Sequence, residues 1–180
     1  VYGILRMINF AHSEVFMSGA FTATFVAAGL MNIGWWNGLP VLSLIIVMAV
    51  AASVSALVAF LVERIAYRPL RHAPRLVPLI TAIGASFFLQ YTFRGLYGSG
   101  LKGYPEMEIF KGEIVLLGIR FFKTQLVVII GAIIMMAVLY SIVQYTKMGK
   151  AMRAVSEDKD TAALMGIDVD RTISTTFVLG

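Results

Sequence analysis

Four long apolar stretches alternate with polar segments along the 180 residues of this chain. They cover residues 15–33, 41–62, 76–97 and 124–143. Each comes close to or exceeds the roughly 20 mostly apolar residues that a helix needs to cross a bilayer, where no water can satisfy backbone groups. Arg94 is the only charged residue inside these stretches. The pattern predicts an all-α, polytopic transmembrane helix bundle.

Composition supports a membrane protein. Hydrophobic residues make up 59% of the chain, above the roughly 45–50% apolar share of soluble domains, and the mean hydropathy is +0.84. The net charge of +5 comes from basic residues between the apolar stretches, which favours lipid headgroups over nucleic acid as their partner. The chain has no cysteine, and His12 and His72 are far apart, so we predict no disulfide, metal site or cofactor.

Apolar runs also lie at both ends of the chain, at residues 1–5 and 173–180. We expect these runs to belong to partial spans. Residues 1–180 would then form a single transmembrane domain that is incomplete at both ends.

Basic residues are distributed unevenly between the polar segments. Segments 63–75 and 145–172 carry nine of them: Arg64, Arg68, Arg71, Arg75, Lys147, Lys150, Arg153, Lys159 and Arg171. Segments 34–40 and 98–123 carry four: Lys102, Lys111, Arg120 and Lys123. Because loops rich in lysine and arginine stay inside the cell, we predict that the first two segments are cytoplasmic. Trp35 and Trp36 then fall in an external turn, where we expect them at the membrane interface.

Two further patterns concern local structure. The external segment 113–122 is too short to span and is rich in strand formers around Gly118, which predicts a small hairpin. Small residues recur at helical spacing in the first two spans and indicate close helix packing. They are Gly19, Ala23, Ala27, Ala51, Ala52, Ser55, Ala56 and Ala59.

Polar residues within or beside the spans are candidates for a translocation path. Ser86, Gln90 and Arg94 follow one another at four-residue spacing, so they share one helix face. That face either lines the path or packs against a helix, with Arg94 reaching the nearby interface.

The polar cluster 9–14 precedes the first span. Asn9 or Ser13 could cap the helix, with Glu14 favoured in its first turn by the helix dipole. Alternatively, Asn9, His12 and Glu14 belong to a discontinuous helix beside the path.

The second cytoplasmic segment, 145–172, contains signals for a short helix. Ser156 precedes Glu157, Asp158 and Asp160 and is placed to cap an acidic first turn, and Gly166 fits the position that ends a helix. The helix between them, 159–165, offers Ala162, Ala163 and Met165 for contact. It is either a docking element for another protein or a solvated surface helix.

Three motifs in order carry a family resemblance: residues 6–14 (RMINFAHSE), 63–71 (ERIAYRPLR) and 149–154 (GKAMRA). With these motifs and residues 161–167, the chain resembles the branched-chain amino acid ABC transporter permeases, and more closely the first of their two permease subunits. Ser13 departs from the family, which usually has glycine there.

The resemblance implies a non-enzymatic subunit of the bacterial or archaeal inner membrane that imports leucine, isoleucine and valine. Its partners would be a second permease subunit, two ATP-binding cassette subunits that hydrolyse ATP, and an extracytoplasmic substrate-binding protein. The 159–165 helix would couple to the ATPase, which assigns coupling roles to Glu157, Asp158, Ala162, Ala163 and Gly166. Urea, short amides or sugars remain alternative cargoes. An intramembrane enzyme is disfavoured, because His12-Ser13-Glu14 lacks the cysteine pair of a zinc deaminase.

Overall fold

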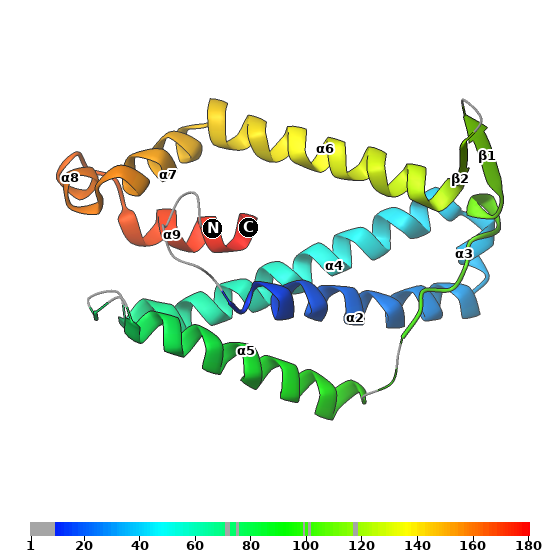
Figure 1. The fold of residues 1–180 in the computed structure, drawn as a ribbon, viewed down its shortest axis with the longest axis horizontal. Helices are drawn as coiled ribbons and strands as arrows, with labels where there is room; N and C mark the ends of the chain where they lie inside the picture. The colour runs from blue at the N-terminus through cyan, green and yellow to red at the C-terminus, as the bar shows by residue number, and fades with distance from the viewer. Residues whose placement is uncertain (1–9, 71–72, 75, 99, 101, 117–118) are drawn as a thin grey trace.

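The computed structural model describes residues 10–70, 73–74, 76–98, 100, 102–116 and 119–180. Within them, four helices are long and apolar enough to cross a membrane. They are α2 (His12–Asn32), α4 (Pro40–Val62), α5 (Leu76–Tyr97) and α6 (Lys123–Tyr145) (Figure 1). The predicted all-α transmembrane architecture is confirmed, and each predicted span lies within three residues of its helix boundaries.

The helices α2 and α4 pack closely through the small residues. A Cβ atom added to Gly19 would lie 2.6 Å from the carbonyl oxygen of Ala51 and would also collide with Ser55 Oγ. The Ser55 hydroxyl donates a hydrogen bond across the interface to the carbonyl oxygen of Val15 at 3.1 Å. Ala23 and Ala27 are fully buried. The predicted close packing of the first two spans is therefore confirmed, because only small side chains permit this approach.

The start of α2 differs from the sequence expectation. Its N-cap residue is Ala11, which offers no side-chain cap. Ser13 lies inside the helix, and its hydroxyl donates to Glu14 Oε2 at 2.6 Å. The capping role predicted for Ser13 is wrong, because helical backbone geometry already begins at His12. Asn9 lies outside the described residues.

Buried side chains form two clusters at opposite ends of the α2–α4 pair. One contains Ala23, Ala27, Leu30, Trp36, Val47 and Met107. The other contains Ala11, Val62, Tyr67, Ala82, Val155, Ala162, Ile173 and Phe177. Residues 63–70 and 147–172 thus come together at one end (Figure 1), as expected for segments separated by two spans.

The turn after α2 is a short helix, α3 (Trp35–Gly38), that follows Gly34 in the left-handed conformation. It directs Trp36 into the first cluster, where the side chain is only 4% exposed. Trp36 therefore packs against other parts of the chain, and the place of this external turn at the membrane interface stays a prediction. Trp35, on the opposite side of this turn, is 45% exposed.

The helix α4 does not stop where its apolar run stops. It continues as a π-helical turn, η1 (Glu63–Tyr67), and then as a 3₁₀ turn, η2 (Arg68–Leu70). Pro69 lies in the second turn, where its missing N–H prevents further α-helical bonding. The wider π-helical turn η1 and the tighter 3₁₀ turn η2 therefore replace the regular α-helix beyond the apolar residues of α4.

The segment between α5 and α6 carries the predicted hairpin. Strands β1 (Glu113–Leu116) and β2 (Ile119–Phe122) pair antiparallel, with Glu113 opposite Phe122, after a 3₁₀ turn, η3 (Glu108–Phe110). This segment passes over α2, where the Tyr104 hydroxyl donates to the carbonyl oxygen of Ala20 at 2.8 Å. Burial raises the pKa of Tyr104 above its usual value.

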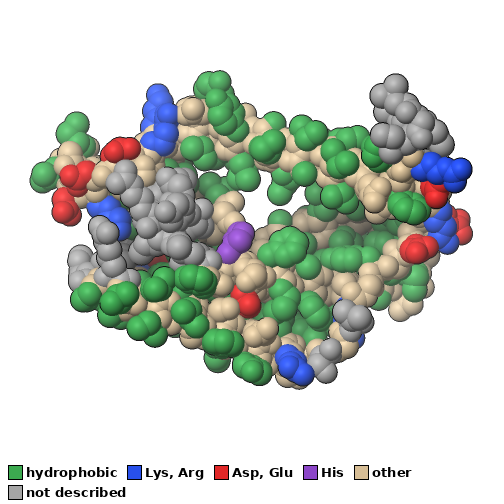
Figure 2. Space-filling view, in the orientation of Figure 1, with side chains coloured by type: hydrophobic (Ala, Val, Ile, Leu, Met, Phe, Trp, Pro, Cys, Tyr) green, Lys and Arg blue, Asp and Glu red, His purple; other side chains and the backbone are tan. Residues whose placement is uncertain are grey.

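Helix α6 stands apart from the other long helices (Figure 1). None of its residues is buried against the described part of the chain. Hydrophobic side chains cover its surface and the middle of α5, whereas most charged side chains gather at the two ends of the molecule (Figure 2). This distribution matches a protein that exposes apolar surface to lipid chains or to further transmembrane helices.

The segment 145–172 is mostly helical and contains more helix than the single short one expected from the sequence. It contains α7 (Lys147–Glu157), α8 (Lys159–Leu164) and the start of α9 (Val169–Leu179). The helix α7 is amphipathic, because it buries Met152 and Val155 on one side. The high content of polar residues in this segment makes that helix difficult to recognise from the sequence. The apolar run 173–180 expected to begin another span lies almost entirely in α9.

Candidate functional site

The first candidate site is the helical corner at the basic end of the molecule, formed by α7, α8 and α9. Thr146 caps α7: its Oγ1 accepts from the N–H of Gly149 at 3.0 Å and donates to the carbonyl oxygen of Ile142 at 2.6 Å. Arg153 Nη1 donates to Gln144 Oε1 at 2.6 Å. These contacts hold α7 at a fixed angle to the end of α6.

Asp158 caps α8. Its Oδ1 accepts from the backbone N–H groups of Thr161 at 3.1 Å and Asp160 at 2.9 Å. Hydrogen bonds from Thr161, and secondarily from Asp160, lower the pKa of the Asp158 carboxyl below its usual value. The cap predicted at Ser156 is wrong, because α7 runs through that residue and its hydroxyl donates to the carbonyl oxygen of Arg153.

The C-terminal end of α8 is capped at Gly166, as the sequence predicts. Gly166 has a φ of 81°, in the left-handed region that favours glycine. Its N–H donates to the carbonyl oxygen of Ala163 at 3.0 Å, and the N–H of Ile167 donates to that of Ala162 at 3.1 Å. These two bonds make a Schellman motif, so α8 is short and defined at both ends.

The two faces of α8 differ. Ala162 is buried in the cluster with Ile173 and Phe177, so it attaches α8 to α9. Ala163 is exposed, and the next two side chains, Leu164 and Met165, are 88% and 79% exposed. Glu157, the last residue of α7, is also exposed. The exposure of Met165 agrees with the contact role expected for it, whereas sequence reasoning missed Leu164, although two large apolar residues before a helix-ending glycine are a usable signal for a contact surface.

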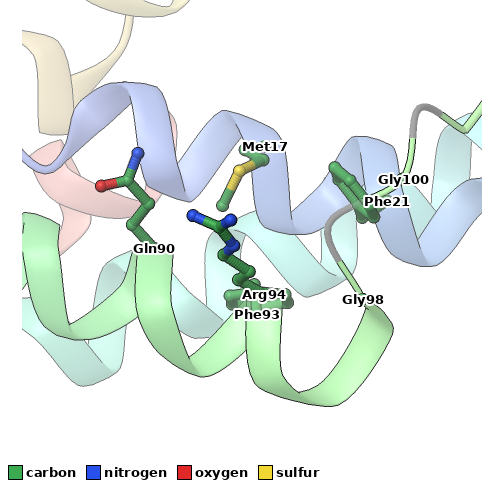
Figure 3. A pocket seen from close by; sticks show the side chains of 7 residues that line it. All are labelled: Met17, Phe21, Gln90, Phe93, Arg94, Gly98 and Gly100. Carbon is green, nitrogen blue, oxygen red and sulfur yellow. The ribbon is translucent and has the colours of Figure 1, made fainter.

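The second candidate site is a cavity between α2 and α5. It has a volume of about 320 Å³ and is lined by Met17, Phe21, Gln90, Phe93, Arg94, Gly98 and Gly100. The Gln90 and Arg94 side chains extend from α5 toward α2, with the guanidinium group near Met17 (Figure 3). A cationic group and an amide thus face apolar and aromatic side chains across one open cavity.

The structure brings together only part of the predicted path. Gln90 and Arg94 share the cavity, whereas Ser86 is half-buried one turn earlier on α5 and does not line it. His12 is exposed and Glu14 half-buried on the first turn of α2, before the cavity-lining Met17. Met17 and Phe21 were not predicted, because nothing local distinguishes them from other apolar residues of the span.

Among the residues that the structure describes, no three or more histidine, cysteine, aspartate or glutamate side chains are grouped so that they could hold a metal ion. The full sequence contains no Gly-x-x-x-x-Gly-Lys-Ser/Thr loop for nucleotide phosphates.

The structure thus has four helices apolar enough to span a membrane, a capped helical corner at one end, and a cavity near the other end that is lined in part by Gln90 and Arg94. These features are those of a multi-pass membrane protein. The chain belongs to the family described as branched-chain amino acid transport system / permease component, whose model matches residues 1–180. The resemblance drawn from the sequence motifs is confirmed.

Curated relatives share this assignment. The chain is 38% identical to the high-affinity branched-chain amino acid transport system permease protein LivH of Escherichia coli K12, over 100% of this chain and 59% of the relative. Identity to LivH of Salmonella typhimurium is 36%, and to BraD of Pseudomonas aeruginosa 38%, with the same coverage. The chain thus spans about three-fifths of the length of these relatives. No solved structure gives a significant match.

Proposed function

We propose that this chain serves as a transmembrane permease of an ABC importer for leucine, isoleucine and valine in a bacterial or archaeal inner membrane. The observation that carries the proposal is the match of all 180 residues to the permease family. Its partners are a second permease subunit, two ATP-binding cassette subunits and an extracytoplasmic binding protein. In this proposal ATP is hydrolysed by a partner, in keeping with a sequence that has no Gly-x-x-x-x-Gly-Lys-Ser/Thr loop for nucleotide phosphates.

Uptake into proteoliposomes tests the cargo. The full-length subunit is reconstituted with its partners, and ATP-dependent uptake of labelled leucine, urea and ribose is measured. We expect leucine uptake that unlabelled isoleucine and valine inhibit. Uptake of urea or ribose without leucine would overturn the proposed cargo.

Within this function, α8 is the element that docks on the ATPase. The exposed Ala163, Leu164 and Met165 provide the contact, and Ala162 holds the helix on α9. Asp158 and Gly166 fix the two ends of α8, and Glu157 borders the docking surface. Ala163→Glu should therefore prevent ATPase co-purification, because a charge and added volume would enter a close contact. The matched control is Ala151→Glu on the half-buried side of α7; the same loss in both variants would refute a specific docking role.

The cavity between α2 and α5 is the candidate path. The Arg94 guanidinium and Gln90 amide suit the carboxylate of an amino acid, and Met17, Phe21 and Phe93 suit its aliphatic side chain. Lysine keeps the charge of Arg94 but cannot form the bidentate pair. We expect Arg94→Lys to reduce kcat/KM for leucine uptake by about tenfold, equivalent to about 1.4 kcal/mol. Normal uptake at normal expression would instead mean that the Arg94 side chain only extends to the membrane–water interface and does not contact the cargo.

Topology is tested separately. Glu106, in the external segment, and Met165, at the end of α8, are both exposed. Single cysteines at these positions, in this cysteine-free background, should react with a membrane-impermeant thiol reagent from opposite sides of the membrane. Labelling from the same side would refute the assignment of the basic segments to the cytoplasm.

A further inference from the structure

A carboxylate is completely buried where α4 changes into the π-helical turn η1. The Glu63 side chain is 0% exposed, and its Oε2 accepts a hydrogen bond from the Ser174 hydroxyl of α9 at 2.7 Å. The two residues are 111 positions apart in the sequence. Burying a carboxylate costs free energy unless hydrogen bonds compensate, so an apolar residue would stabilise this junction at least as simply.

A second polar contact joins the same two elements. Arg68 Nη2 lies 3.3 Å from Asp170 Oδ2, and both side chains are about half exposed. Asp170 and Ser174 are four residues apart on α9, so they lie on one face of that helix. Two polar contacts therefore follow one another along the α9 face, which makes a ladder of two rungs, Glu63–Ser174 and Arg68–Asp170.

The π-helical turn is what aligns these rungs. The N–H of Arg68 bonds to the carbonyl oxygen of Glu63, and this wider, five-residue turn brings Arg68 back toward the helix face that carries Glu63. In a regular α-helix, residues five apart differ by about 140° around the axis, because each residue adds about 100°. Arg68 would then turn away from α9 while Glu63 faced it.

Apolar packing already attaches α9 beside this ladder. The rings of Tyr67 and Phe177 lie 5.1 Å apart between centroids, and Ile173 is buried in the same cluster. Such contacts tolerate sliding better than paired polar groups do, because hydrogen bonds depend strongly on distance and angle. The ladder therefore defines which residues of α9 lie opposite which residues of η1.

Rigid connections extend from both sides of the ladder. On one side, the Schellman motif at Gly166 and the Asp168 cap, whose Oδ1 accepts from the N–H of Arg171 at 2.9 Å, link α8 to α9. On the other side, η1 continues α4, which packs closely on α2 at Gly19.

We propose that Glu63, Arg68, Asp170 and Ser174 are positioning residues that hold α9 in register with α4, so that a displacement of α8 is transmitted to the transmembrane pair α2–α4. This role rests on the proposed function, in which α8 receives the movement of the ATPase. The residues touch neither cargo nor nucleotide. Their effect is on the number of molecules transported per ATP hydrolysed.

The test uses the full-length subunit assembled with its partners in proteoliposomes. The variants are Ser174→Ala, Asp170→Asn and the double variant, and the measured quantity is the ratio of leucine uptake to ATP hydrolysis. The matched control is Thr175→Ala, since the Thr175 hydroxyl donates to the carbonyl oxygen of Arg171 within α9. We expect the control to keep the wild-type ratio and the double variant to lose about tenfold, with assembly and hydrolysis retained.

Charge exchange separates positioning from general stability. Arg68→Asp alone should lower the ratio, and Arg68→Asp combined with Asp170→Arg should restore at least half of it. Melting temperature is measured in parallel. A fall in melting temperature with an unchanged ratio, or a wild-type ratio in the variant that combines Ser174→Ala with Asp170→Asn, would overturn the ladder. Failure of the wild-type complex to take up leucine would refute the proposed function instead, so the two failures are distinguishable.

Discussion

The packing of α2 on α4 predicts that two glycine-to-alanine substitutions, Gly19→Ala and Gly29→Ala, differ strongly in their effect on stability. At Gly19, an added Cβ atom would lie 2.6 Å from the carbonyl oxygen of Ala51, whereas ordinary contact begins near 3.4 Å. The shortfall of about 0.8 Å (3.4 − 2.6) involves a backbone atom, which cannot rotate away. At Gly29, in the same helix, an added Cβ atom meets nothing within 4 Å.

The magnitude follows from two opposing terms. Replacing glycine by alanine inside a helix stabilises it by about 0.5–1 kcal/mol at either position. Overpacking at Gly19 costs about 1–3 kcal/mol, because α2 must move from α4 and the Ser55–Val15 hydrogen bond is stretched. Gly29→Ala should therefore be neutral or stabilising. Gly19→Ala should be less stable than Gly29→Ala by about 1–3 kcal/mol, since the helix-propensity gain cancels in the comparison.

Thermal unfolding of the purified protein in detergent provides the assay. For a chain of this size, 1 kcal/mol shifts Tm by about 2–4 °C, so the two variants should differ by about 2–12 °C. Trp36, buried between the ends of α2 and α4, is a suitable fluorescence reporter of their separation. Adding Ser55→Ala to Gly19→Ala should recover only part of the loss, because the Ala51 carbonyl remains. Equal Tm values for Gly19→Ala and Gly29→Ala would refute the close approach of the two helices.

Three further substitutions address the helical corner. Gly149→Ala should lower Tm because its Cβ would lie 2.5 Å from the carbonyl oxygen of Ile142, whereas Gly131→Ala on α6, where the Cβ meets nothing within 4 Å, should not. Gly166→Val should cost about 1–2 kcal/mol, since a branched residue resists a φ of 81°, and hydrogen exchange of the α8 amides should accelerate. The pKa of Asp158 is lowered in the folded protein, so its cap stabilises α8 above the unfolded pKa near 3.8 and is lost as pH falls through the folded pKa. Asp158→Asn should keep the cap and abolish this acid-dependent increase in α8 exchange.

The spans could be predicted from the sequence because crossing a bilayer is a local requirement. A run of about 20 apolar residues must form a helix whatever its neighbours are, since the backbone has no other hydrogen-bond partner. The pairing of β1 with β2 and the end of α8 at Gly166 were predictable for a related reason, because local backbone conformation depends on nearby residues. The family motifs likewise required only the order of residues along the chain.

Tertiary structure alone decided which surfaces meet. Ser156 has the right chemistry for a cap, but α7 packs Met152 and Val155 into the core and so continues past it to Glu157. Trp36 has the chemistry of an interface residue, but α3 turns it into a cluster built from α2, α4 and the distant Met107. Burial of apolar surface outweighs such local preferences, and it depends on partners elsewhere in the chain.

Both candidate sites and the ladder depend on such distant partners. Arg94 of α5 and Met17 of α2 line the same cavity, and Glu63 accepts a hydrogen bond from Ser174, 111 residues later in the chain. The sequence alone determined which segments enter the membrane and where its short helix α8 ends. Only the packed structure determined that Ala162 faces the core while Leu164 faces outward, because a helix face acquires its role from the element that covers it.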